Sequence, residues 1–102
     1  MGLVDKQNKF AGMVALLILY AQSLGYQITF GDAFRDPRVS YGHPKSTHRV
    51  RLAVDLNLFK DDVYLASDED HAPLHDFWDS IGGSERIKRD ANHYSLEHQG
   101  VR

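Results

Sequence analysis

The start of the chain carries apolar residues at three- and four-residue spacing. Residues at this spacing share one side of an α-helix, so the pattern predicts a helix over residues 6–24. Gly25 follows directly and suits the left-handed turn that ends many helices. We expect the apolar stripe to face the protein core. Its members are Phe10, Met13, Val14, Leu17, Ala21 and Leu24.

Three later stretches are rich in apolar residues that alternate with polar ones, which is the period of a β-strand with one buried side. They predict strands over residues 26–30, 52–59 and 91–98. Residues 60–62 are expected to form a turn. Residues 63–65 would then return as the second strand of a hairpin.

A second helix is expected at residues 73–81, starting near Ala72 and ending at a pair of glycines. Residues 31–47 contain Gly and Pro and are expected to form a long irregular loop, and loops of this length are often functional. The order of helix, strand, loop, strand pair, helix and strand predicts an α+β fold with a small, mainly antiparallel sheet and flanking helices. Residues 1–102 are expected to form one domain.

The composition is ordinary for a globular protein, with 42% hydrophobic and 25% charged residues. The chain contains no cysteine, which excludes disulfide scaffolds, thiol catalysis and zinc sites built on cysteine. The formal net charge of -2 disfavours nucleic acid as a partner. The apolar run over residues 10–21 is too short to span a bilayer and lacks the features of a signal peptide. We therefore expect a monomer that is made in the cytoplasm and does not insert stably into a membrane.

Basic residues are concentrated between positions 35 and 51, which hold a single acid, Asp36. Two interpretations are open. The segment either binds a small anionic ligand or is a solvated loop without a binding role. The basic residues are Arg35, Arg38, Lys45, Arg49 and Arg51.

Asp55 is the unusual residue of the strand predicted at 52–59, because apolar residues flank it on both sides. A carboxylate inside a strand needs a partner, which can be an arginine, backbone donors or a metal ion. His48 stands just before this strand, and His93 is expected on the same face of the last strand. If the two strands are neighbours, the three side chains converge. Two histidines and one carboxylate leave an open coordination position, as in catalytic zinc sites.

Asp90 lies three residues before His93 and is placed to act as a general base beside such a metal. The spacing alone also fits histidines that form ordinary hydrogen bonds at the surface. His98 is expected to face away from His93. The histidines expected at the surface or in local hydrogen bonds are His43, His71 and His75. Trp78 is expected in the core, and the acidic run at 67–70 in a solvated turn at a helix start.

Two short motifs carry a resemblance to a known family. Ser46-Thr47-His48, followed by Ala53-Val54-Asp55-Leu56, resembles the Ser-x-His-(x)6-Asp signature of the D-alanyl-D-alanine carboxypeptidase and L-alanyl-D-glutamate endopeptidase family. Asp90-Ala91-Asn92-His93-Tyr94 is similar to the second signature of these zinc peptidases, an acid, two residues, then His and an aromatic. The family includes phage endolysins. The two motifs stand in the family's order.

The resemblance implies a role for each motif residue. His48, Asp55 and His93 would hold Zn²⁺. Asp90 would activate water and later protonate the leaving amine. The two further roles fall to Arg35, which would stabilise the oxyanion or bind substrate, and to Ser46, which would contact the substrate backbone.

The resemblance also implies a setting. The fold would be the one that these peptidases share with the hedgehog signalling domain, and the substrate would be a peptidoglycan stem peptide, whose carboxylates suit the basic loop. The protein would act on the cell wall after release, in a phage-infected or prophage-carrying host. One alternative is a zinc-binding recognition module of the same fold without hydrolytic activity, although such a module has no use for an acid at position 90. A nuclease is disfavoured by the net charge.

Overall fold

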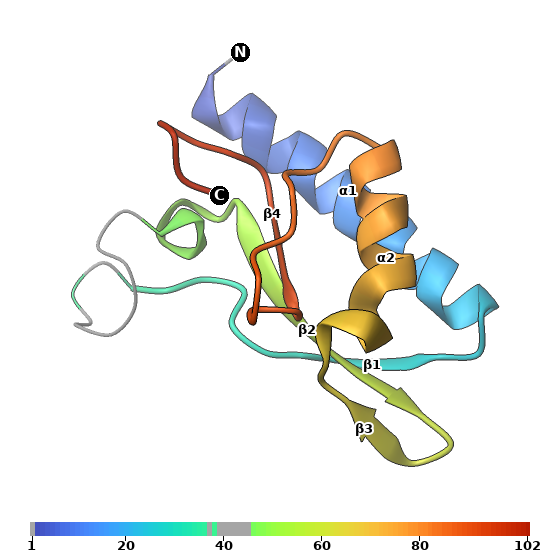
Figure 1. Ribbon diagram of the computed structural model, residues 1–102. Helices are drawn as coiled ribbons and strands as arrows, with labels where there is room; N and C mark the ends of the chain where they lie inside the picture. The colour runs from blue at the N-terminus through green and yellow to red at the C-terminus, as the bar shows by residue number, and fades with distance from the viewer. Residues whose placement is uncertain (1, 37, 39–45) are drawn as a thin grey trace.

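The computed structural model describes residues 2–36, 38 and 46–102 (Figure 1). It is an α+β fold with a small antiparallel sheet and two helices, as the sequence predicts. In chain order the elements are α1 (Leu3–Ser23), β1 (Gln27–Phe30), the short 3₁₀ helix η1 (Thr47–Val50), β2 (Ala53–Lys60), β3 (Val63–Leu65), α2 (Asp68–Ser80) and β4 (His93–Ser95).

Strand β2 is the centre of the sheet, because the three other strands all pair with it and all run antiparallel to it (Figure 1). β1 lies along one edge of β2, with Phe30 opposite Leu56. β3 pairs with the far end of β2, and β4 pairs with its beginning. The predicted hairpin of β2 and β3 is confirmed.

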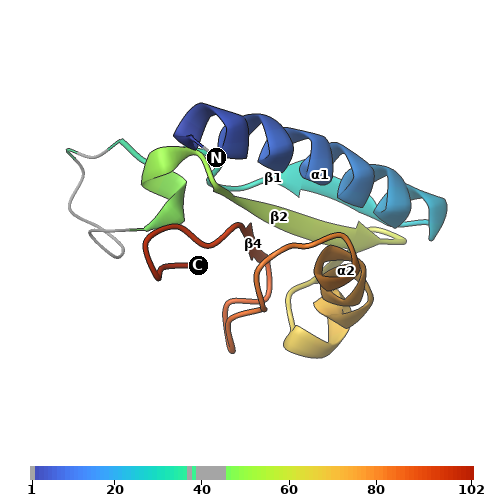
Figure 2. The same ribbon diagram turned by 90° about the horizontal axis from the view of Figure 1, so that it is seen from above.

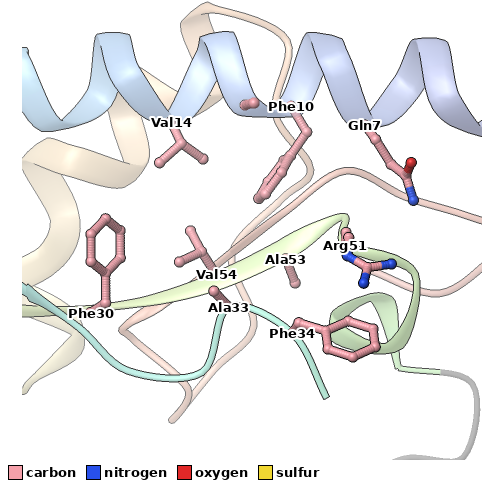
Figure 3. Close-up of a pocket in the computed structure, with 10 residues that line it drawn as sticks. Gln7, Phe10, Val14, Phe30, Ala33, Phe34, Arg51, Ala53 and Val54 are labelled. Atoms are coloured by element: carbon pink, nitrogen blue, oxygen red, sulfur yellow. The ribbon is translucent and has the colours of Figure 1, made fainter. Parts of the chain in front are cut away.

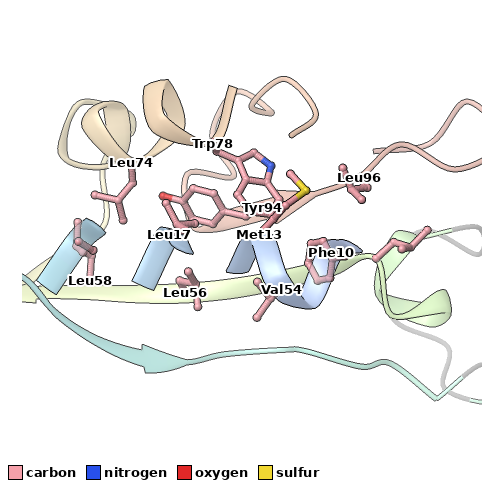
Figure 4. Packing of buried hydrophobic residues seen from close by; sticks show 12 residues of the cluster. Phe10, Met13, Leu17, Val54, Leu56, Leu58, Leu74, Trp78, Tyr94 and Leu96 are labelled. Atoms are coloured by element: carbon pink, nitrogen blue, oxygen red, sulfur yellow. The ribbon is translucent and has the colours of Figure 1, made fainter. Parts of the chain in front are cut away.

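The core is built where both helices meet β2 and β4 (Figure 4). α1 runs along the length of β2 (Figure 2). The alternation predicted for β2 is confirmed, since its even-numbered apolar residues are fully buried whereas Asp55 and Asn57 are only partly buried. Fully burying one such side chain stabilises the fold by roughly 1.5–3 kcal/mol. The core residues are Phe10, Met13, Leu17, Ala21, Leu52, Val54, Leu56, Leu58, Leu74, Trp78, Tyr94 and Leu96.

The start predicted for the second helix is wrong. α2 begins at Asp68, not near Ala72. Ser67 forms a capping box with Asp70: its hydroxyl accepts a hydrogen bond from the Asp70 N–H at 3.0 Å, and the Asp70 carboxylate accepts one from the Ser67 N–H at 3.3 Å. Pro73 lies inside the helix and does not start it. The acidic run at 67–70 thus caps the helix and forms its first turn.

The last strand is shorter than predicted. Only His93–Ser95 form β4, because β2 begins at Ala53 and offers no strand beyond that residue. The N–H of Leu96 makes one more hydrogen bond, to the Leu52 carbonyl at 2.9 Å. Residues 47–50 form η1, a short helix that was not predicted and that begins at the last residue of the predicted loop.

His71 and His75 are expected at the surface or in local hydrogen bonds, and the second alternative is the one found, since both are buried. Their expected local hydrogen bonds are present. Nε2 of His71 lies 3.1 Å from the Leu65 carbonyl oxygen, and Nε2 of His75 lies 2.7 Å from the Ala91 carbonyl oxygen. A carbonyl only accepts, so both Nε2 atoms carry the proton. His71 Nδ1 then accepts from the Tyr94 hydroxyl at 2.7 Å. Burial favours the neutral form of both rings.

Acid should weaken the fold through this pair of histidines. Burial lowers the pKa of both from the ordinary value of 6.5. Below that pH the unfolded chain binds a proton on each histidine and the folded chain does not, so the contribution to stability is present above pH 6.5 and is lost as the pH falls. Replacing His75 with Gln should reduce the loss of unfolding free energy between about pH 7.5 and 5.5 by roughly 1 kcal/mol in urea titrations.

The matched control for that measurement is His98→Gln, which removes a partly exposed histidine outside the buried pair. It should leave the loss of stability at low pH close to that of the parent. An equal effect of the two substitutions would contradict the assignment of acid sensitivity to the buried pair.

Candidate metal centre

The register between β2 and β4 brings the first two candidate ligands together. Asp55 and His93 are directly opposed in the antiparallel pair. Directly opposed residues of two neighbouring strands point to the same face of a sheet. The prediction that the two residues share a face therefore agrees with this register.

His48 reaches the same place from η1, the turn just before β2. The Ser46 hydroxyl caps this turn by accepting a hydrogen bond from the His48 N–H at 3.3 Å. Arg51 ends it in the left-handed conformation, with φ at 57°, which reverses the chain into β2. The Leu52 N–H closes the turn on the Thr47 carbonyl at 2.9 Å.

Asp55 is held from its other side by the segment that follows β1. Its N–H donates to the Asp32 carbonyl at 2.8 Å, and its carbonyl accepts from the Gly31 N–H at 2.8 Å. A Cβ on Gly31 would lie 3.0 Å from the Cβ of Asp55, so the absence of a side chain at position 31 permits this close pairing. The ligand-bearing part of β2 is thus fixed along both edges.

The three side chains form one compact group of possible metal ligands. One ligand atom from each of His48, Asp55 and His93 lies within 4.8 Å of the others. Oδ1 of Asp55 is 3.2 Å from Nε2 of His48 and 3.6 Å from Nδ1 of His93. Tetrahedral ligands placed about 2.1 Å from a metal lie about 3.4 Å from one another. Both measured separations are close to that value.

The hydrogen bonding of the group also fits a cation. Asp55 Oδ1 is buried without a hydrogen bond of good geometry, and its polar neighbours are Nε2 of His48 and Nδ1 of His93. The second ring nitrogens of the two histidines, Nδ1 of His48 and Nε2 of His93, are buried without a hydrogen-bond partner as well. Buried polar atoms without partners are costly and rare in proteins. A metal between the three ligand atoms would satisfy Asp55 Oδ1, so the group can hold a metal ion. It would leave the two unpartnered ring nitrogens as they are, because Nε2 of His48 and Nδ1 of His93 are the atoms that approach Asp55.

The charge state of Asp55 suits a metal ligand. Its burial by itself would raise the pKa of the carboxyl group, but the adjoining imidazoles of His48 and His93 outweigh that effect and lower the pKa to about 2. Asp55 is therefore ionised at neutral pH. An ionised carboxylate can coordinate a cation without first losing a proton.

A pocket of about 310 Å³ opens over this group. The six residues to which the motif resemblance assigns a role all line it, whereas Arg35 is the only one of the described basic residues between positions 35 and 51 that does. Beyond the three ligands, these residues are Arg35, Ser46 and Asp90.

Asp90 and Arg35 differ in how they enter the pocket. Asp90 Oδ2 lies 3.8 Å from Nδ1 of His93, and its side chain is half exposed, so solvent reaches it. Arg35 is buried. Its N–H donates to the His48 carbonyl at 3.1 Å, and its guanidinium lies 3.4 Å from the Asp32 carboxylate. The acid is therefore accessible and the arginine is held in place.

Comparisons of the chain with protein-family models, with curated proteins and with solved structures find no match. The family resemblance of the two motifs remains a prediction from the sequence. The geometry of the site stands independently of it.

The structure adds three residues to the pocket that the sequence analysis did not select. These are Ile87, Val101 and Arg102. A basic residue and an aliphatic one at the end of the chain carry no periodic signal, and no motif points to them. His98 is not part of the metal group and forms an isolated bridge with Val101 instead. His43 lies outside the described residues.

A second pocket, of about 440 Å³, lies between α1 and the segment that follows β1 (Figure 3). Its walls are mostly apolar and include Phe10 and Val54, and Arg51 lies 4.1 Å above the ring of Phe34 at its rim. Val54 and Asp55 are neighbours in β2 yet line different pockets. Ala53 also lines the apolar pocket, and the two pockets have no lining residue in common.

Proposed function

We propose that this protein is a zinc-dependent peptidase that cleaves peptidoglycan stem peptides. The observation that carries the proposal is the presence of two histidines, one ionised carboxylate and a separate accessible carboxylate, Asp90, in one pocket. Three protein ligands leave a coordination position open, which is the arrangement of catalytic zinc sites. The fourth group, Asp90, is not needed as a ligand and is free for proton transfer.

Each residue has a distinct task in the proposed hydrolysis. Bound Zn²⁺ would supply a Lewis acid that polarises the scissile carbonyl and makes water more acidic. Asp90 accepts the proton of the attacking water as the new C–O bond forms, and it donates that proton to the amine as the C–N bond breaks. The guanidinium of Arg35 offers hydrogen bonds to the oxyanion or to a substrate carboxylate. Ser46 stabilises the turn that presents His48.

The choice of peptidoglycan rests on the two motifs and on the charge of the pocket. Stem peptides carry carboxylates, and Arg35 and Arg102 both line the site. The same motifs support a role in lysis of the cell wall by a phage or prophage. No helix in the described part of the chain is long and apolar enough to cross a membrane.

Removing the metal should abolish the activity. We expect purified cell wall to be cut by the metal-loaded protein, to resist it after treatment with a chelator, and to be cut again when zinc is added, because the scissile carbonyl has no other Lewis acid in the pocket. The new amino and carboxyl ends, identified by mass spectrometry, show which bond is broken. Hydrolysis that persists in the chelator would overturn the zinc mechanism.

The same experiment separates the peptidase from a zinc-binding recognition module. A module of that kind would bind cell-wall fragments in the presence of zinc and release no new ends. Binding without cleavage would therefore replace the proposed function with the recognition module.

A further inference from the structure

The segment from Glu97 to Arg102 folds back on itself as a tight hairpin. His98 and Val101 exchange two backbone hydrogen bonds, of 2.7 and 3.0 Å. The two residues between them, Gln99 and Gly100, both have positive φ, of 52° and 81°. Positive φ at both central positions is the mark of a type I′ turn. We refer to residues 97–102 as the 97–102 hairpin.

The 97–102 hairpin is held in a conformation that its sequence does not favour. Gln99 has a side chain in the left-handed region, which costs roughly 1–2 kcal/mol for residues other than glycine. Two contacts of Glu97 keep it there: its carboxylate accepts a hydrogen bond from the Gly100 N–H, and its carbonyl accepts one from Lys6 Nζ at 2.7 Å. Backbone strain that the surroundings maintain in this way is concentrated at functional sites.

The hairpin delivers two side chains to the metal pocket. Val101 and Arg102 both line it, together with Asp90 and the ligands. The strained turn therefore places an aliphatic group and a guanidinium beside the candidate metal.

The guanidinium of Arg102 is available to a ligand. It pairs with Glu85 at 3.1 Å, but both side chains are well exposed, at 45% for Arg102 and 79% for Glu85. Exposed ion pairs are weak, commonly below about 1 kcal/mol, and exchange partners readily. A carboxylate that enters the pocket can take the place of Glu85. Arg35, by contrast, is buried on the His48 side of the pocket.

We propose that Arg102 is a specificity residue that binds a carboxylate of the substrate beside the metal group. Ile87 and Val101 give the pocket an aliphatic wall, which suits a small apolar side chain next to that carboxylate. The ligand class is a short peptide or acylated amino acid with a free carboxylate. Its identification as a stem peptide rests on the proposed function, whereas the binding of a carboxylate by Arg102 does not.

The test uses zinc-loaded protein and two probes, N-acetyl-D-glutamate and its neutral diamide, titrated by NMR. The parent should prefer the carboxylate probe. Arg102→Gln should weaken binding of that probe roughly five- to tenfold and leave binding of the diamide unchanged, because only a charge-assisted hydrogen bond is lost. Arg102→Lys should restore part of the affinity. Glu85→Gln should strengthen carboxylate binding, since it removes the competing acid.

The charge control is Lys9→Gln, which removes one positive charge from an exposed position on α1. It should change carboxylate binding little. Equal losses with Lys9→Gln and Arg102→Gln would reduce the effect to net charge and would overturn the inference, as would an unchanged carboxylate preference in Arg102→Gln.

The outcomes separate the two proposals. Zinc-dependent hydrolysis with no effect of Arg102 on carboxylate binding removes the specificity role alone. A carboxylate preference that depends on Arg102, in a protein that cuts no cell wall, supports the specificity role and removes the peptidase.

Discussion

Replacing Asp90 with Ala is expected to leave the metal bound and to lower hydrolysis of purified cell wall by at least about 100-fold. Asp90 lines the pocket, and its Oδ2 lies 3.8 Å from Nδ1 of His93. It does not belong to the group of three candidate ligands. The substitution removes the proton acceptor and keeps all three ligands. Metal content is measured by elemental analysis of the dialysed protein, and hydrolysis by the release of new amino groups.

The control for this prediction is Asp90→Glu, which keeps a carboxylate at the same position and should retain measurable hydrolysis. Full activity in Asp90→Ala would contradict the proposed role of Asp90 in proton transfer. Loss of the metal in that variant would instead make Asp90 a fourth ligand, and the site would then be a closed, structural one.

Gly83→Ala should destabilise the fold by about 3 kcal/mol or more, which is at the upper end for overpacking a core. A Cβ at this position would overlap the pyrrole edge of the Trp78 indole, at Nε1 and Cδ1. Trp78 cannot move aside easily, because it is fully buried and its Nε1–H donates to the Ser95 carbonyl at 3.0 Å. The expected loss is read from urea unfolding followed by circular dichroism.

The neighbouring glycine provides the matched control. Gly82 has φ at 97° with open space around it, so Gly82→Ala carries backbone strain of roughly 1–2 kcal/mol and no steric overlap. Gly83→Ala should therefore be clearly the less stable of the two. Equal stabilities would contradict the packing of Gly83 against the indole.

The prediction of the candidate metal group rests on local sequence patterns, on the resemblance of the two motifs and on one assumption about which strands are neighbours. Strand alternation puts Asp55 on the side of β2 that faces away from its apolar residues. A carboxylate that is partly buried in such a strand needs a charged or hydrogen-bonding partner. The same alternation placed His93 on the matching face. The antiparallel pairing of β2 with β4 then supplied what the pattern could only assume, that the two strands are neighbours.

The errors had physical causes that single residues illustrate. Pro73 was read as a helix start, but the capping box at Ser67 is the stronger signal and begins α2 at Asp68. The sequence leaves two placements open for His71 and His75, at the surface or in local hydrogen bonds, because it does not show which polar groups surround them. In the core, carbonyl oxygens and the Tyr94 hydroxyl pair with three of their ring nitrogens. The sequence does not point to Arg102, because the type I′ turn before it has Gln99 at its first central position. Such turns prefer Asn, Asp or Gly there, so the turn was not recognisable from the residues.

The central position of β2 has a consequence for the order in which the molecule assembles. β2 and β3 are joined by a two-residue turn at 61–62, and such hairpins close within microseconds. β4 can pair with β2 only after the chain has looped through α2 and the segment beyond it, and contacts of that kind form late. The pairing that brings His93 to Asp55 is therefore expected among the last folding events. A nascent or partly folded chain would lack the assembled group of His48, Asp55 and His93, so the capacity to hold a metal ion there would report that this last pairing has formed.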